Sequence, residues 1–236
     1  MSRSFERSSL LLLATVAAVT GCADGPIPGL ASMNPWLRSE WAADEKFGPT
    51  FFQKQTELAR LRTAAPSMNP AERAKLANQL AERFREENSH VLRAEIARTL
   101  STFPDEIAEQ TLIIAAADQD SDVRRLACEG LSRRSTESAL KTLSNVLSSE
   151  SDLDVRLAAA RGLGTFNNPV AVNSLGAALD DQDAAMRFTA MQSLKSSTGK
   201  DYGTSVVAWK EYVQGGNPAP PPGPSVAQQL QKWWYW

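Results

Sequence analysis

A phrase that recurs four times between residues 91 and 194 constrains the fold of this chain most strongly. Its centre is an arginine, and successive arginines are 31, 32 and 31 residues apart. A leucine follows each arginine by seven residues, and an isoleucine or alanine follows it by three. A fixed period of about 20–50 residues is typical of repeat proteins, in which each unit buries its apolar face against its neighbours. The arginines are Arg93, Arg124, Arg156 and Arg187, and the leucines are Leu100, Leu131, Leu163 and Leu194.

Each unit reads as a helix, a turn and a second helix. The apolar positions at −1, +3 and +7 from the arginine share one face of an α-helix. Short acidic turns precede these helices, and Asp and Ser there suit a helix N-terminus because their side chains accept backbone N–H groups. Pro104 and Pro169 are expected to begin the helices that follow them. The earlier helix of each unit carries paired apolar residues: Leu76 and Leu80, Leu112 and Ala116, Leu143 and Leu147, and Leu175 and Leu179.

Two copies of the phrase, DSDVRRLACEGL and DLDVRLAAARGLG, fit the pattern D-x-x-V-R-x-x-A-x-x-x-L. This pattern resembles HEAT repeats of the short, phycobilisome-lyase-like type, and the resemblance covers residues 71–199. It implies an all-α fold, an α-solenoid of about four HEAT-like helix pairs with helical caps at both ends. Such repeats occur in bilin lyases, in hydroxylases and in plain binding scaffolds, so the resemblance alone implies no activity.

The first 21 residues are predicted to be a lipoprotein signal peptide. Two arginines precede the apolar run Leu10–Val19, which is shorter than the about 20 residues of a transmembrane helix. The run ends in Val19-Thr20-Gly21-Cys22, which resembles the bacterial lipobox, whose cysteine is acylated and becomes the mature N-terminus. We therefore expect a lipid anchor on Cys22, rather than an ordinary signal peptide with a chance cysteine. The expected location is the cell envelope, on the periplasmic or outer side of a bacterial membrane, and Ala23 favours the outer membrane.

The mature chain is expected to have five parts after this segment. Trp36 and Trp41 of the first part are expected to cover the open end of the solenoid, because terminal repeats need capping. Trp209 and Tyr212 lie one turn apart in the helix expected at the other end, Ser205–Val213. The parts are a membrane tether with an N-terminal helical extension (22–66), the HEAT-like solenoid (67–199), a capping helix (200–214), a Pro/Gly linker (215–225) and an aromatic tail (226–236).

The aromatic tail contains three of the six tryptophans of the chain. It ends in Trp233, Trp234, Tyr235 and Trp236. Tryptophan has an apolar body and one hydrogen-bond donor, so it suits a protein groove and a membrane interface equally. Three hypotheses therefore stay open: docking into a partner, insertion at a membrane surface, and folding back onto the chain's own solenoid.

Catalytic and metal-binding patterns are close to absent from the sequence. His90 is the one histidine, and Cys128 occupies a core-facing repeat position, so neither a metal cluster nor a Cys–His nucleophile is expected. HEAT hydroxylases use repeated His-Glu pairs for iron, and the chain has none. Four acidic residues match positions 1, 3, 5 and 12 of an EF-hand, but Val123 stands where that loop needs glycine. We expect these residues, Asp118, Asp120, Asp122 and Glu129, to cap and flank a helix without calcium, and we expect no cofactor, metal or catalytic residue.

The charge balance argues against nucleic acid as a partner. Without Arg3, Glu6 and Arg7 of the signal peptide, the chain keeps 23 of its 25 basic and 26 of its 27 acidic side chains. Binding to a phosphate backbone needs clustered Lys and Arg, and no such cluster is visible.

The repeated arginines are expected to form a structural ladder in which each reaches an acidic turn of a neighbouring repeat. A binding surface is instead expected at the outward positions of the second helices, which line the concave face of such solenoids. Leu157 and Phe188 either form a docking patch with Arg161 or pack against the next repeat, since aromatic residues and Arg are enriched in interfaces. The candidate concave-face residues are Arg98, Arg125, Glu129, Leu157, Arg161 and Phe188.

These observations favour a non-enzymatic, membrane-anchored scaffold of the cell envelope that binds an unidentified envelope protein, with no small-molecule substrate. One alternative is an enzyme or enzyme subunit of a HEAT-like lyase type, which predicts a deep pocket with convergent polar groups. Another is a purely structural envelope lipoprotein.

Overall fold

The computed structural model describes residues 48–219 of the chain. The chain divides into two compact units, Met1–Lys54 and Gln55–Trp236, and the boundary lies within helix α3 (Phe51–Ala64). In the first unit, residues 48–54 show how α3 begins. The backbone N–H of Thr50 donates to Oε1 of Gln53 at 2.8 Å, and the N–H of Gln53 donates to Oγ1 of Thr50 at 3.3 Å. This reciprocal pairing is a capping box.

The predicted signal peptide, the anchor cysteine Cys22, Trp36 and Trp41 lie outside the described residues, as does the aromatic tail with Trp233, Trp234, Tyr235 and Trp236. Among residues 48–219, no helix combines the length and the apolar character that crossing a bilayer requires.

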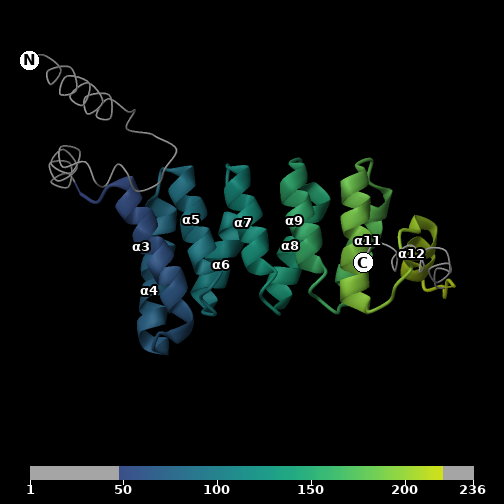
Figure 1. Cartoon of the computed structure of the whole chain (residues 1–236), viewed down its shortest axis with the longest axis horizontal. Helices are drawn as coiled ribbons and strands as arrows, with labels where there is room; N and C mark the ends of the chain where they lie inside the picture. Colours follow the sequence, from purple (N-terminus) through teal and green to yellow (C-terminus); the bar gives the residue numbers. More distant parts are fainter. Residues whose placement is uncertain (1–47, 220–236) are drawn as a thin grey trace, which may run out of the picture. The chain divides into compact units, whose positions relative to one another are not determined.

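The second unit is an array of four helix pairs within its described residues, and it contains no strand there. The first helices of the pairs pack in one row and the second helices in another (Figure 1). This confirms the predicted all-α solenoid. The pairs are α4 (Pro70–Glu86) with α5 (His90–Leu100), α6 (Glu106–Ala115) with α7 (Ser121–Leu131), α8 (Glu137–Ser149) with α9 (Leu153–Leu163), and α10 (Pro169–Ala177) with α11 (Ala184–Thr198); the 3₁₀ segments η3 (Ala65–Ser67) and η4 (Ala178–Asp180) follow α3 and α10.

The core of the array is one continuous cluster of buried side chains that runs through the pairs and joins each pair to its neighbours. Leu112, Leu143 and Leu175 of the first helices are fully buried. The small residues three positions after the ladder arginines are also fully buried, and they let neighbouring second helices approach closely: Ala127, Ala159 and Ala190. Burying a leucine side chain contributes about 1.5–3 kcal/mol. Each pair therefore depends on its neighbours for much of its stability.

Polar side chains mark the helix starts that the acidic turns predict. Oδ1 of Asp120 and of Asp152 each accepts two backbone N–H groups, at the starts of α7 and α9. Pro169 is the first residue of α10, as predicted. The prediction for Pro104 is wrong, because α6 begins two residues later and Asp105 takes the N-cap position. The carboxylate of Asp105 binds Nε of Arg73 at 2.9 Å instead of capping the helix.

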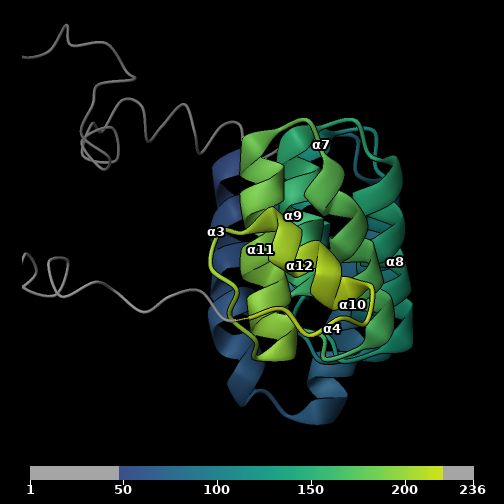
Figure 2. The same ribbon diagram turned by 90° about the vertical axis from the view of Figure 1, so that its right-hand side faces the viewer.

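Helix α12 (Val206–Val213), with Ser205 as its N-cap, crosses the last pair (Figure 2). Trp209 is fully buried, and its Nε1 donates to the carbonyl oxygen of Gly203 at 3.1 Å. The rings of Tyr202 and Trp209 meet edge to face, with centroids 5.0 Å apart. At the other end of this unit, Leu58 of α3 is buried against the array, and Oγ1 of Thr99 donates to its carbonyl oxygen at 3.4 Å. Helices outside the four pairs thus cover part of both ends.

Gly164, which follows α9 directly, lies close to the backbone of α11. A Cβ there would lie 3.0 Å from both Cα and Cβ of Ser193, and a backbone atom cannot yield as a side-chain tip can. We expect Gly164→Ala to lower the free energy of unfolding by about 1–3 kcal/mol. Urea denaturation followed by circular dichroism measures this change.

Gly162→Ala is the matched control for that variant. The added Cβ would lie 3.1 and 3.2 Å from the two terminal methyl groups of Leu143, and these methyl groups can move. The gain in helix propensity, about 1 kcal/mol, offsets the crowding. Equal destabilisation by both variants would contradict the assignment of Gly164 to a backbone contact.

Candidate functional site

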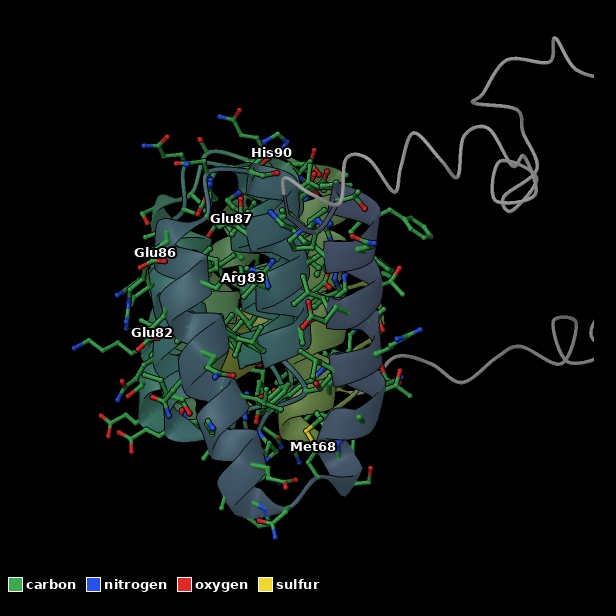
Figure 3. All side chains as sticks on the ribbon, turned by 90° about the vertical axis from the view of Figure 1, so that its left-hand side faces the viewer. Met68, Glu82, Arg83, Glu86, Glu87 and His90 are labelled. Carbon is green, nitrogen blue, oxygen red and sulfur yellow. The ribbon has the colours of Figure 1, made fainter. Side chains whose placement is uncertain are left out.

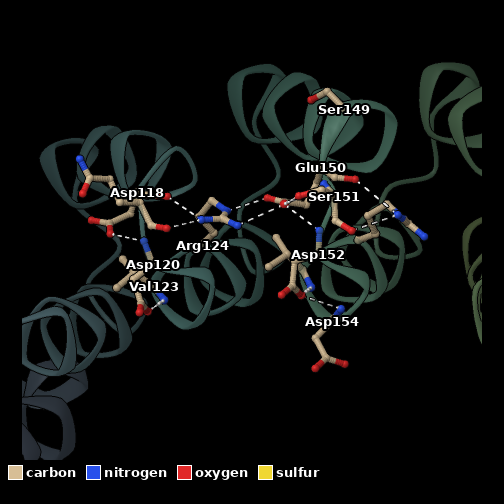
Figure 4. A network of polar contacts seen from close by, with 12 residues as sticks. Asp118, Asp120, Val123, Arg124, Ser149, Glu150, Ser151, Asp152 and Asp154 are labelled. Atoms are coloured by element: carbon tan, nitrogen blue, oxygen red, sulfur yellow. Dashed lines mark hydrogen bonds and ion pairs between the residues drawn. The ribbon is translucent and has the colours of Figure 1, made fainter.

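The turn between the two helices of each pair is built in the same way. Its first residue is acidic and accepts the backbone N–H of the residue two positions later, which is itself the N-cap of the second helix. In the turn before α7, Oδ1 of Asp118 accepts the N–H of Asp120 at 2.9 Å (Figure 4). The equivalent bonds join Ser89 to Glu87 at 3.0 Å, Asp152 to Glu150 at 2.9 Å and Asp183 to Asp181 at 2.8 Å.

Arg93 connects its own turn to the turn of the following pair. Its Nη1 donates to the carbonyl oxygens of Glu87 and Asn88 at 3.1 and 3.0 Å. Its Nε and Nη2 donate to the two carboxylate oxygens of Asp118 at 2.8 and 2.9 Å. A bidentate bond of this kind adds directional specificity to the charge attraction. The arginine therefore fixes the distance and the register between neighbouring pairs.

Arg124 repeats this arrangement one pair further along. Nη1 donates to the carbonyl oxygens of Asp118 and Gln119 at 2.7 and 2.9 Å. Nε and Nη2 donate to Glu150 at 2.6 and 3.1 Å, as Figure 4 shows.

The arginine ladder weakens toward the C-terminal end of the array. Nη2 of Arg156 lies 3.4 Å from Asp181, and its buried Nε has no hydrogen-bond partner. Nη1 of Arg187 donates to the carbonyl oxygens of Asp181 and Gln182 at 2.8 and 2.9 Å. Within residues 48–219, however, Arg187 has no acidic partner, because α11 is the last second helix and Asp201, in the turn after it, binds Lys195 at 2.7 Å.

The two strongest ladder pairs hold their carboxylates in the charged form. Hydrogen bonds from Arg124 lower the pKa of Glu150 to about 2, against the opposing effect of burial. Burial raises the pKa of Asp118, but the hydrogen bond from Arg93 and the backbone N–H of Asp120 together outweigh it, so the net pKa is below the ordinary value. Both groups therefore contribute stability at neutral pH that is lost in acid.

Most charged residues of the second-helix face are neutralised by their own neighbours. Arg98 lies 3.1 Å from Glu95, which also binds Arg62 of α3 at 3.0 Å. Arg125 binds Asp122 at 3.0 Å and Glu129 at 2.8 Å. Sequence reasoning missed Glu95, because the residues two positions after the other ladder arginines are Leu126, Ala158 and Thr189 and show no acidic column.

The remaining candidates of this face differ in exposure. Leu157 is partly buried against the core, which agrees with the packing alternative for this residue rather than with an exposed position. Phe188 is 51% exposed, because no later second helix lies beside α11 within residues 48–219. Arg161 is exposed and has no acidic partner in the part of the chain that the structure describes. The structure therefore leaves Arg161 and Phe188 available on neighbouring helices.

The other polar groups of the described chain are committed to structure. Asp118 and Asp120 serve the turn, while Asp122 and Glu129 bind Arg125. No three His, Cys, Asp or Glu side chains among residues 48–219 are placed to hold a metal ion. His90 is the exposed first residue of α5. Burial raises the pKa of the Cys128 thiol to about 12, so this thiol is neutral and poorly nucleophilic at neutral pH.

Comparison with known families agrees with this geometry. The sequence profile of HEAT repeats matches residues 77–156 and again residues 140–207, which together make up more than half of the chain. The chain belongs to the HEAT-repeat family. None of the curated proteins compared with the chain matches it. HEAT repeats generally mediate protein interactions, because stacked pairs present an extended surface.

The ladder pairing makes stability depend on pH in a definite range. We expect Glu150→Gln to lower the free energy of unfolding near neutral pH by about 1–3 kcal/mol, because Arg124 loses its charged acceptor. The pKa of Glu150, about 2, lies below its ordinary 4.5, so its contribution is complete above that ordinary value and disappears as the pH falls toward 2. The difference between wild type and variant should shrink across this range in urea denaturation experiments.

Asp154→Asn is the matched control. Asp154 is exposed in the first turn of α9, close to Glu150, and has no ion pair among the described residues. Its substitution should cost less, and the cost should vary little with pH. A Glu150→Gln effect that stays constant down to about pH 2.5 would rule out the linkage.

Proposed function

We propose that this protein is a non-enzymatic, membrane-anchored scaffold of the bacterial cell envelope that binds a partner protein through its second-helix face. The observation that carries the proposal is the half-exposed ring of Phe188 on a helix that packs against the helix of Arg161, an arginine without an acidic partner among the described residues. No nucleic acid and no small-molecule substrate is part of this function.

The register of the repeats places these side chains in one area. Phe188 and Leu157 each stand one residue after a ladder arginine, and Gln192 and Arg161 each stand five residues after one. Their helices, α9 and α11, pack directly against each other. We call these four residues the Phe188 patch. An exposed aromatic ring and an uncompensated guanidinium on adjacent helices are residue types that interface hot spots favour.

The rest of the second-helix face offers a partner fewer unpaired charges. Arg62 and Arg98 share Glu95, and Arg125 lies between Asp122 and Glu129. A partner carboxylate would have to compete with these intramolecular pairs, whereas Arg161 has none among the described residues. Electrostatic complementarity thus directs an acidic and apolar partner surface to the C-terminal half of the array.

A pull-down from crosslinked envelope fractions tests the Phe188 patch. We expect Phe188→Ser to reduce recovery of the partner about tenfold or more, because losing a buried aromatic anchor costs at least about 1.4 kcal/mol of binding free energy. Val170→Ser is the matched control, since Val170 is also 51% exposed but lies on α10, in the row of first helices. Equal loss with both variants, or no loss with Phe188→Ser, would contradict the assignment.

The same pull-down separates the contribution of the aromatic tail. A chain truncated after Gly223 lacks Trp233, Trp234, Tyr235 and Trp236. A partner recovered with the truncated chain, but not with Phe188→Ser, binds the second-helix face. A partner recovered only with the intact chain binds the tail. Recovery of no partner by any form would favour the alternative of a purely structural envelope lipoprotein.

The membrane anchor of this proposal rests on the lipobox-like Val19-Thr20-Gly21-Cys22. Acyl chains on one residue give stable anchoring when two or more are attached, since each buried methylene contributes about 0.8 kcal/mol. The expected site is an envelope membrane, with the outer membrane favoured.

Metabolic labelling with an alkyne fatty acid in a bacterial host tests the anchor. We expect label on the wild type and none on Cys22→Ser, which should also move to the soluble fraction. Cys128→Ser is the control, because Cys128 is fully buried in the core and should not accept a lipid. Retention of the label by Cys22→Ser would exclude acylation at this residue.

The second candidate is an enzyme or enzyme subunit of the short, phycobilisome-lyase-like class. It needs an enclosed pocket with convergent polar groups. A depression of about 680 Å³ between α8 and α10 is open to solvent. Its walls are Ser, Asn and Ala side chains with Asp180 and Asp181, so we rank this candidate below the scaffold.

A further inference from the structure

The arginine ladder has an unfilled last position. Nη1 of Arg187 is held by the carbonyl oxygens of Asp181 and Gln182 at 2.8 and 2.9 Å, as Nη1 of Arg124 is held by the carbonyls of its own turn. In Arg93 and Arg124, the other edge of the guanidinium binds a carboxylate of the following turn. Within residues 48–219, no carboxylate binds this edge of Arg187.

We propose that Arg187 is a binding site for a carboxylate of a partner protein, supplied by an Asp or Glu that precedes a helix. The inference does not depend on the Phe188 patch, because Arg187 belongs to the turn edge of the array and the patch to the second-helix face.

The filled positions of the same ladder define the chemistry of this ligand. Asp118 and Glu150 each receive Nε and Nη2 of an arginine, with distances between 2.6 and 3.1 Å. Each stands two residues before the N-cap of a helix and also accepts the N–H of that N-cap residue. The matching ligand is thus an acidic side chain two residues before a helix N-cap. The planar fork of arginine recognises such a carboxylate with two parallel bonds.

The preceding carbonyl contacts prepare Arg187 for this ligand. The two hydrogen bonds that Nη1 donates restrict the Arg187 side chain before any partner arrives. This restriction lowers the entropic cost of binding. Restriction of this kind distinguishes Arg187 from a solvated surface arginine such as Arg161, which makes no side-chain hydrogen bond within the described residues.

The last pair leaves space where a following repeat would pack. Phe188, the residue after Arg187, is 51% exposed, whereas the equivalent Leu157 is partly buried. Helix α12 packs against α10 and α11, and in Figure 2 it does not cross the upper turns of α11. Arg187 is the fourth residue of α11. A partner helix can therefore approach this end without displacing α12.

A partner protein fits this site better than a second copy of the chain. The acidic residue at the opposite end of the ladder is Glu87, beside the start of α5 (Figure 3), and it has no ion pair within the described residues. Helix α3 packs along α5 further from its start, where Leu58 is buried and accepts a hydrogen bond from Thr99 and where Arg62 binds Glu95 at 3.0 Å. A second copy could bring its α11 to α5 only by displacing α3.

The chain supplies its own probe for the test. A fluorescein-labelled peptide that copies residues 145–163 contains Glu150, the turn and helix α9. In the folded protein, Arg124 binds the Glu150 carboxylate of this segment. The affinity of the peptide for the full mature chain is measured by fluorescence anisotropy. We expect binding that weakens about tenfold when the peptide carries Glu150→Gln. An isolated helix of this length is marginal, and Glu150 also accepts the N–H of Asp152 in the turn. The loss is therefore assigned to Arg187 by the double-mutant comparison with Arg187→Gln, in which any change in peptide ordering cancels.

Variants of the protein locate the binding site. Arg187→Gln should bind the original peptide about tenfold more weakly, and Glu150→Gln in the peptide should then add no further loss. Arg187→Lys keeps the charge and loses the fork, so it should give an intermediate loss even if Arg187→Gln folds poorly. Arg161→Gln is the matched control and should bind like the wild type.

Several outcomes overturn the proposal. They are absence of peptide binding, equal affinity for the two peptides, or equal loss with Arg161→Gln. Binding that occurs only after truncation at Gly223 would show that the chain's own tail occupies Arg187. A concentration-dependent dimer in sedimentation velocity that Arg187→Gln abolishes would show that a second copy is the ligand.

Discussion

Close packing between consecutive second helices is the constraint on which the rest of this structure depends. Ala127, Ala159 and Ala190 are fully buried at their contacts, and Gly164 meets the backbone of the next pair. Larger residues at these positions would separate the helices. The guanidinium of a ladder arginine spans only from its own turn to the next one. The small residues of the core therefore set the distance at which the polar edge of the array can form its bonds.

The arginine ladder fixes the register of neighbouring pairs, which the non-directional packing of the core alone does not. Hydrophobic burial alone would tolerate some sliding of one pair past another. A bidentate pair such as Arg93 with Asp118 tolerates little, since both carboxylate oxygens are engaged. The same carboxylate also accepts the N–H of the helix N-cap residue, so helix initiation and repeat stacking share one group. Breaking a mostly buried pair of this type costs more than its net contribution, because the partner left behind stays charged.

The period of the sequence made the helix pairs, their buried faces and their N-caps predictable, because each of these features depends on local spacing. The pairing of surface charges was less accessible. Glu95 binds two arginines from different helices, and no column of equivalent residues announces it. Pro104 shows the same limit, since the choice between Pro104 and Asp105 as the helix start depends on Arg73, which lies 32 residues away from Asp105. Whether Leu157 is exposed also depends on a neighbouring helix, because α11 packs against α9, the helix that carries Leu157.

The end of a repeat array is where identical sequence positions acquire different physical roles. Arg187 and Phe188 occupy the same repeat positions as Arg156 and Leu157. Among the described residues, however, Arg187 lacks the carboxylate partner that Arg156 has, and Phe188 lacks the packing neighbours that partly bury Leu157. Both differences have one cause: within the part of the chain that the structure describes, no following second helix packs beside the N-terminal turns of α11. Inside the array these positions stabilise the stack, and a substitution there is felt as lost stability. At its end the same chemistry is presented outward, so binding specificity can arise without any change in the repeat that produces it.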